Sequence, residues 1–111
     1  MSEIATVAWV DVGSLDDLPP QAVQRIETPR GPIALFRTIE GGVFALADRC
    51  PHEGGPLSEG IVHGRAVTCP LHSWVIDLES GEPKGGDAGK GCARIFGVRV
   101  ERDRILLAWR G

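Results

Sequence analysis

Short runs of β-prone residues, separated by turns rich in Gly and Pro, recur along the whole chain of 111 residues. Runs of this length between such turns are typical of strands. The pattern predicts strands at residues 5–10, 23–28, 33–39, 43–47, 60–63, 66–68, 75–78, 98–101 and 105–109. One short helical turn is expected at residues 14–18, capped by Ser14 and stopped by the two prolines that follow. The chain is therefore expected to be all-β.

The turn signals order these strands. Residues 29–32 (Pro-Arg-Gly-Pro) and residues 40–42 (Glu-Gly-Gly) favour turns that would join residues 23–47 into a meander. Residues 83–91 are rich in Gly and predict a surface loop. Trp9 and Trp109 lie within predicted strands and are expected in the core.

Length and charge restrict the function. A chain of 111 residues is expected to form a single domain over residues 1–111. The formal net charge is −3 with both signs interspersed, which predicts no nucleic-acid partner. No apolar run approaches the length that crosses a bilayer, so no membrane partner is expected.

Cysteine usage and the N-terminus suggest a compartment. Residues 1–12 include Glu3 and Asp11 and lack the basic start and apolar run of a signal peptide. Three cysteines, an odd number, suit a reducing compartment better than a disulfide framework. We therefore expect a cytoplasmic protein, with Cys92 as a small buried residue.

Two Cys-His pairs carry the candidate chemistry. Cys50-Pro51-His52 and Cys69-Pro70-Leu71-His72 lie in loops rich in Pro and Gly, and 16 residues separate His52 from Cys69. Two thiolates and two imidazoles in this order are the donor set of a Rieske 2Fe–2S centre, in which histidines replace cysteines on one iron. The spacing therefore predicts a protein that carries one electron at a time.

The local chemistry of both loops agrees with a bound cluster. Residues i and i+2 of an extended segment point to the same side, so Cys50 and His52 can address one object. Gly54 and Gly55 allow the backbone to approach a sulfide and to donate N–H hydrogen bonds to sulfur. A zinc site of the Cys2His2 type is the alternative, although zinc sites more often pair Cys with Cys and His with His at short spacing.

The sequence resembles a known family at these residues. The Cys-x-His and Cys-x-x-His pairs resemble the Rieske box. Residues 50–83, CPHEGGPLSEGIVHGRAVTCPLHSWVIDLESGEP, together with residues 33–49 and 91–109, resemble the small subunit of assimilatory NAD(P)H-dependent nitrite reductase. The resemblance covers most of the chain from about residue 18 onward.

This resemblance implies a fold, a site and a partner. The fold would be the Rieske type, with stacked antiparallel sheets and a cluster-binding subdomain at one tip, at about residues 48–76. Cys50 and Cys69 would bind the inner iron, and His52 and His72 the outer iron. The chain would be the electron-transfer subunit, without catalytic residues, of an enzyme whose large subunit carries sirohaem and FAD and reduces nitrite to ammonium in nitrate assimilation.

Two further functions fit the same residues. A stand-alone Rieske ferredoxin that feeds an aromatic-ring dioxygenase has the same size and the same box. A subunit without a cluster, which only stabilises a large partner, belongs to a different class. A visible red-brown colour distinguishes a cluster-loaded protein from the latter.

Overall fold

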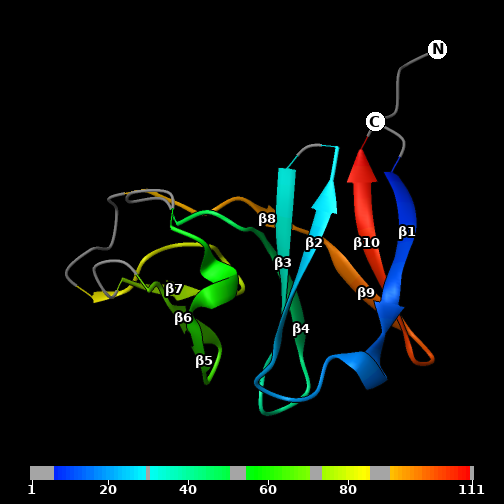
Figure 1. Ribbon diagram of the computed structural model, residues 1–111, viewed down its shortest axis with the longest axis horizontal. Coiled ribbons are helices and arrows are strands. Elements are labelled where there is room, and N and C mark those ends of the chain that lie inside the picture. The colour runs from blue at the N-terminus through cyan, green and yellow to red at the C-terminus, as the bar shows by residue number, and fades with distance from the viewer. Residues whose placement is uncertain (1–6, 30, 51–54, 71–73, 86–90, 111) are drawn as a thin grey trace.

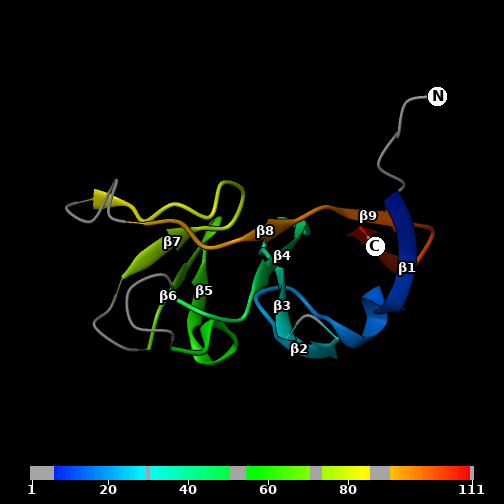
Figure 2. The same cartoon turned by 90° about the horizontal axis from the view of Figure 1, so that it is seen from above.

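The computed structural model of the chain describes residues 7–29, 31–50, 55–70, 74–85 and 91–110. Three antiparallel sheets lie side by side along the longest axis of the molecule (Figure 1). The view from above shows the same order (Figure 2). The prediction of an all-β fold made of stacked antiparallel sheets is confirmed.

Each sheet is named by its position in this order. The outer sheet has the order β1 (Val7–Ser14), β10 (Arg104–Arg110), β9 (Val98–Glu101). The central sheet has the order β2 (Val23–Thr28), β3 (Gly31–Arg37), β4 (Val43–Ala47), β8 (Ile95–Phe96). The tip sheet has the order β5 (Ile61–His63), β6 (Ala66–Thr68), β7 (Val75–Asp77). The described residues also form the 3₁₀ helices η1 (Leu15–Asp17) and η2 (Leu57–Glu59).

The central sheet buries both of its faces. Ile33 and Leu35 of β3 pack against Ile105 and Leu107 of β10 in a core between the outer and central sheets, the outer core. Successive side chains of a strand point to opposite faces. The intervening β3 residues therefore face the other way, into a second core shared with the tip sheet, the tip core. A strand buried on both faces reads as a continuous apolar run, which is how residues 33–36 read.

Strand boundaries differ from the predictions by one residue at three strands and by more at the first strand and at β3, which ends at Arg37 and not at residue 39. The first strand continues beyond residue 10 to Ser14, and a bulge between Asp11 and Gly13 shifts its register against β10. Pairing of Thr28 with Gly31 leaves only two residues in the first hairpin turn, so Gly31 and Pro32 belong to β3. The strand β8 was not predicted, because two residues are too few to show a period.

Two burial predictions were wrong. Trp9 is 42 % exposed, because it pairs with Ala108 on the face of the outer sheet opposite to Leu107, and that face is open. Its ring lies 5.3 Å from the Arg99 guanidinium, as a cation–π pair. Cys92 is exposed, with its thiol 3.5 Å from the carbonyl oxygen of Ser80. The side chain of Trp109 lies outside the described part of the structure.

Within the part of the chain that the structure describes, no helix has the length and apolar character needed to cross a membrane.

The outer sheet predicts a pH-dependent contribution to stability. The Arg104 guanidinium donates two hydrogen bonds of 2.9 Å to the Asp11 carboxylate, and the Gly13 N–H donates a third. The hydrogen bond from Arg104 holds the pKa of Asp11 below its usual value. Stability from a lowered carboxyl pKa is present above the unfolded-state value and is lost as the pH falls through the folded-state value. Asp11→Asn should therefore lower the urea midpoint at neutral pH, and its difference from wild type should vanish in acid. An equal difference at both pH values would contradict this reading.

Candidate metal centre

Each candidate cysteine stands where a strand of the molecule ends. Cys69 directly follows β6, and Cys50 lies three residues beyond the end of β4. Their exposed fractions are 1 % and 2 %, and both side chains belong to the tip core. The strands that precede Cys50 and Cys69, β4 and β6, are both paired with neighbouring strands. Hydrogen-bonded strands therefore position the two thiols in one apolar region.

Both candidate ligand loops are closed by the same kind of hydrogen bond. The Cys50 N–H donates to the carbonyl oxygen of Gly55 at 2.7 Å. The Cys69 N–H donates to the carbonyl oxygen of Trp74, also at 2.7 Å. Each bond joins the first residue of a loop to its last, and each loop contains one of the two predicted histidine ligands, whose positions lie outside the described residues.

Apolar side chains exclude water from the two thiols. Leu57, at the start of η2, is fully buried in the tip core with both cysteines, and Trp74 is 8 % exposed there. The structure thus buries both residues together with the cysteines. An apolar shell of this kind controls solvent access and so the reduction potential of a bound cluster.

The donor chemistry fits the cysteine half of a Rieske centre. Two buried thiols share one core, and no disulfide joins any of the three cysteines. Within the described residues, no group of three or more candidate metal ligands comes together, and the two predicted imidazoles lie outside that part of the chain. Cys92 is exposed and does not belong to the tip core.

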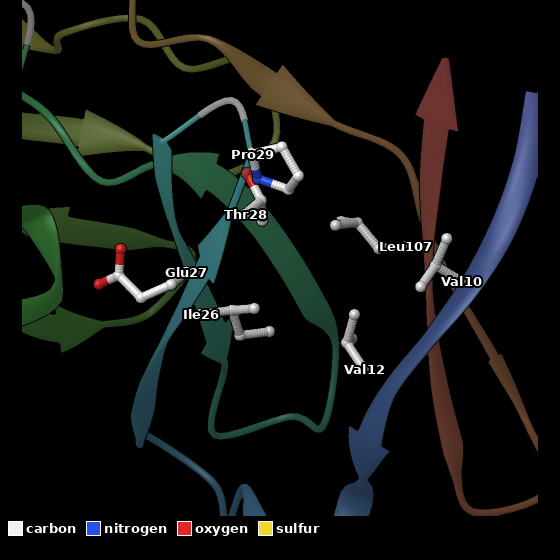
Figure 3. A pocket seen from close by; sticks show the side chains of 7 residues that line it. All are labelled: Val10, Val12, Ile26, Glu27, Thr28, Pro29 and Leu107. Carbon is white, nitrogen blue, oxygen red and sulfur yellow. The ribbon is translucent and has the colours of Figure 1, made fainter. Parts of the chain in front are cut away.

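An apolar pocket of about 320 Å³ lies elsewhere in the molecule. Its wall is formed by β1, β2 and β10, on the outer-core side of the central sheet, as Figure 3 shows. Val10, Val12, Ile26 and Leu107 point into it, whereas Glu27 points away (Figure 3). Both candidate cysteines lie on the other side of the central sheet, so this pocket is separate from the metal centre.

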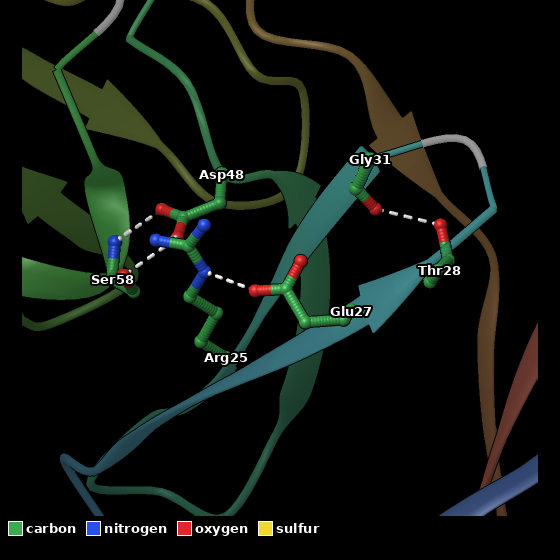
Figure 4. Close-up of polar contacts among 6 residues, drawn as sticks. All are labelled: Arg25, Glu27, Thr28, Gly31, Asp48 and Ser58. Atoms are coloured by element: carbon green, nitrogen blue, oxygen red, sulfur yellow. Dashed lines mark hydrogen bonds and ion pairs between the residues drawn. The ribbon is translucent and has the colours of Figure 1, made fainter.

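Sequence reasoning missed a buried carboxylate beside the first loop. The side chain of Asp48 is 0 % exposed, and its two oxygens accept hydrogen bonds of 2.6 Å from the N–H and the hydroxyl of Ser58 (Figure 4). Arg25 of β2 approaches the same carboxylate at 3.6 Å. The only sequence signal is a charged residue between a predicted strand and the first cysteine, which a solvated turn would also explain.

Comparison with known proteins decides the family. The model of the Rieske [2Fe-2S] domain matches residues 8–96, which is most of the chain. The chain belongs to the Rieske family. Its cofactor is therefore a 2Fe–2S cluster of the Rieske type, and its role is electron transfer within an oxidoreductase system.

Relatives of this Rieske protein include components of dioxygenase systems and nitrite reductase small subunits. The anthranilate 1,2-dioxygenase ferredoxin subunit of Burkholderia cepacia is 37 % identical over 100 residues, covering 90 % of this chain and 91 % of that one. A chain from the complex of reduced oxygenase and oxidized ferredoxin in carbazole 1,9a-dioxygenase is 25 % identical, with a TM-score of 0.80 over 90 % and 92 % of the two chains. A Mycobacterium tuberculosis protein assigned as the NADH-dependent nitrite reductase small subunit is 26 % identical, with a TM-score of 0.82 over 94 % and 96 %. The family is thus established, and the expected nitrite reductase partner stays a prediction.

The tip core predicts a contrast between two apolar residues of the same subdomain. Leu57→Ala should lower the free energy of unfolding by about 2–5 kcal/mol, since it leaves a cavity among fully buried neighbours. Ile61→Ala, at a side chain that is 70 % exposed, should change it by less than about 0.5 kcal/mol. Urea unfolding of both variants measures the difference. Equal costs would show that Leu57 is not part of a packed core.

Proposed function

We propose that this chain is a Rieske ferredoxin that carries single electrons from a reductase to the oxygenase component of an aromatic-ring dioxygenase. The observation that carries the proposal is the 37 % identity to a dioxygenase ferredoxin subunit, over nine-tenths of both chains. The match extends over nearly the whole of that ferredoxin subunit, so the similarity is to a whole electron carrier and not to one domain of an oxygenase.

The ligand assignment is part of the proposal. Cys50 and Cys69 bind the inner iron, and His52 and His72 bind the outer iron. The burial of both thiols in one core and the matched closure of both loops support this assignment. The bound cluster supplies one-electron oxidation and reduction.

The residues of the chain serve transfer rather than substrate chemistry. Leu57 and Trp74 keep water from the cysteine side of the site, where the described residues form an apolar core. The tip sheet lies at one end of the long axis, beyond the central sheet, so a partner can approach the tip sheet without contact with the outer sheet (Figure 1). A small protein with its redox site at one end suits transient docking to a larger redox partner.

A role as the small subunit of an NAD(P)H-dependent nitrite reductase is the second candidate. The similarity of residues 50–83 to that family favours it, as does the structural match to the M. tuberculosis protein. In that case the large sirohaem and FAD subunit would bind nitrite, and this chain would pass electrons or support assembly.

The ligand assignment predicts a contrast among the three cysteines. Cys50→Ser and Cys69→Ser should each lose the cluster, because a serine oxygen is a poor match for this site, and iron should fall from about two per chain toward none. Cys92→Ser should retain iron and sulfide, since Cys92 is exposed and outside the tip core. Iron and labile-sulfide analysis measures this. Stoichiometric zinc without labile sulfide after anaerobic reconstitution would instead favour the Cys2His2 alternative.

The partner assignment predicts which enzyme the protein supports. Added to the reductase and oxygenase components of an anthranilate-type dioxygenase, the cluster-loaded chain should restore substrate-dependent oxygen uptake driven by NADH. The Cys50→Ser chain is the matched control and should restore none. The same two proteins are then added to a nitrite reductase large subunit, with nitrite-dependent NAD(P)H oxidation as the readout. Stimulation only in this second assay would reject the ferredoxin proposal in favour of the nitrite reductase candidate.

A further inference from the structure

The first candidate ligand loop is fastened at its base by a buried carboxylate. Asp48 stands two residues before Cys50, and Ser58 stands in η2, after the loop has closed. The Asp48 carboxylate accepts from the N–H and the hydroxyl of Ser58, at 2.6 Å each (Figure 4). These two hydrogen bonds between Asp48 and Ser58, called the clasp below, span the hydrogen bond between Cys50 and Gly55. The first loop is therefore closed by an inner and an outer set of hydrogen bonds.

The clasp also replaces a missing helix cap. The N-cap of η2 is Pro56, which makes no side-chain cap hydrogen bond. N–H groups in the first turn of a helix have no partner within the helix. Asp48 accepts the N–H of Ser58 in this turn and thereby sets where η2, and with it Leu57, lies over the tip core.

Residues of the central sheet contact both the backbone and the side chain of Asp48. The Asp48 N–H donates to the carbonyl oxygen of Pro32 in β3 at 3.0 Å. Arg25 of β2 lies 3.6 Å from the carboxylate and donates to Glu27 at 2.8 Å. Arg25 is 47 % exposed, whereas the Asp48 side chain is not exposed at all. A negative charge is therefore buried beside the first loop, and its nearby cation is partly in water.

We infer that Asp48 is a positioning residue of the electron-transfer site, whose carboxylate holds the first ligand loop in place and whose buried charge lowers the midpoint potential of the cluster. Both oxygens accept hydrogen bonds, as an ionised carboxylate does. Reduction adds one negative charge to the site, and a buried anion opposes that addition more strongly than an exposed one, because the surrounding dielectric is low. The half-exposed cation of Arg25 offsets only part of this effect.

The charge is tested by removing it at nearly constant shape. Asp48→Asn should raise the midpoint potential in a redox titration of the isolated, cluster-loaded protein followed by visible circular dichroism. The matched control is Asp11→Asn, which removes a carboxylate of the outer sheet that accepts hydrogen bonds from a backbone N–H and from an arginine. The control should leave the potential unchanged. An Asp48→Asn potential equal to wild type, or an equal shift in the control, would overturn the inference.

A second variant tests the inference even if the Asp48→Asn protein fails to hold a cluster. Arg25→Met keeps Asp48 and Ser58 but removes the cation, so it should shift the potential in the opposite direction, downward, and most at low ionic strength. Arg25→Lys should restore the wild-type value. A purely structural role of the clasp predicts no such opposite signs. An Arg25→Met potential that is unchanged or raised would overturn the inference.

The inference rests on the cluster and not on the identity of the partner. The potential is measured without reductase, oxygenase or nitrite reductase, so an unchanged potential rejects the role of Asp48 alone. A failure to support dioxygenase turnover rejects the ferredoxin proposal alone.

Discussion

The burial of both faces of the central sheet is the constraint on which the rest of this molecule depends. Phe36 and Leu46 point to the tip core, and Ile33 and Leu35 point to the outer core. Each face must be covered, because an exposed apolar face of this size costs free energy in proportion to its area. The outer sheet covers one face and the cysteine-bearing subdomain covers the other. The subdomain therefore packs on a sheet whose opposite face is covered by the outer sheet.

This arrangement explains how a small core holds the two candidate cysteines. Cys50 and Cys69 share the tip core with Phe36 of β3, so the thiols rest on the same packing that holds the sheets together. A site on a rigid scaffold needs little rearrangement when charge changes, which is what electron transfer requires. Hydrogen bonds to Gly55 and Trp74 also hold the backbone N–H of each cysteine.

The sequence predicted the parts of the molecule that depend on local pattern. The meander at residues 23–47 and the two pairs of Cys and His could be read directly, because turn residues and ligand spacing are local signals. The two-residue strand β8 and the exposure of Trp9 could not, since both depend on which strands become neighbours. The burial of Asp48 was not predicted for the same reason. A carboxylate becomes a buried clasp only when Ser58 and Arg25, ten and 23 residues away, fold against it.

The buried core and the exposed surface of this protein affect different properties of an electron carrier. The tip core and the loop closures serve any one-electron carrier, so they are compatible with a dioxygenase and with a nitrite reductase alike. A partner meets the exposed residues of the protein, and complementary charge on them governs the rate of encounter more than the affinity. Asp48 lies beneath that surface, with no exposed side-chain area, so it can adjust the potential without altering what a partner meets. Potential and docking can therefore vary independently in this fold, which allows one Rieske scaffold to serve different enzymes.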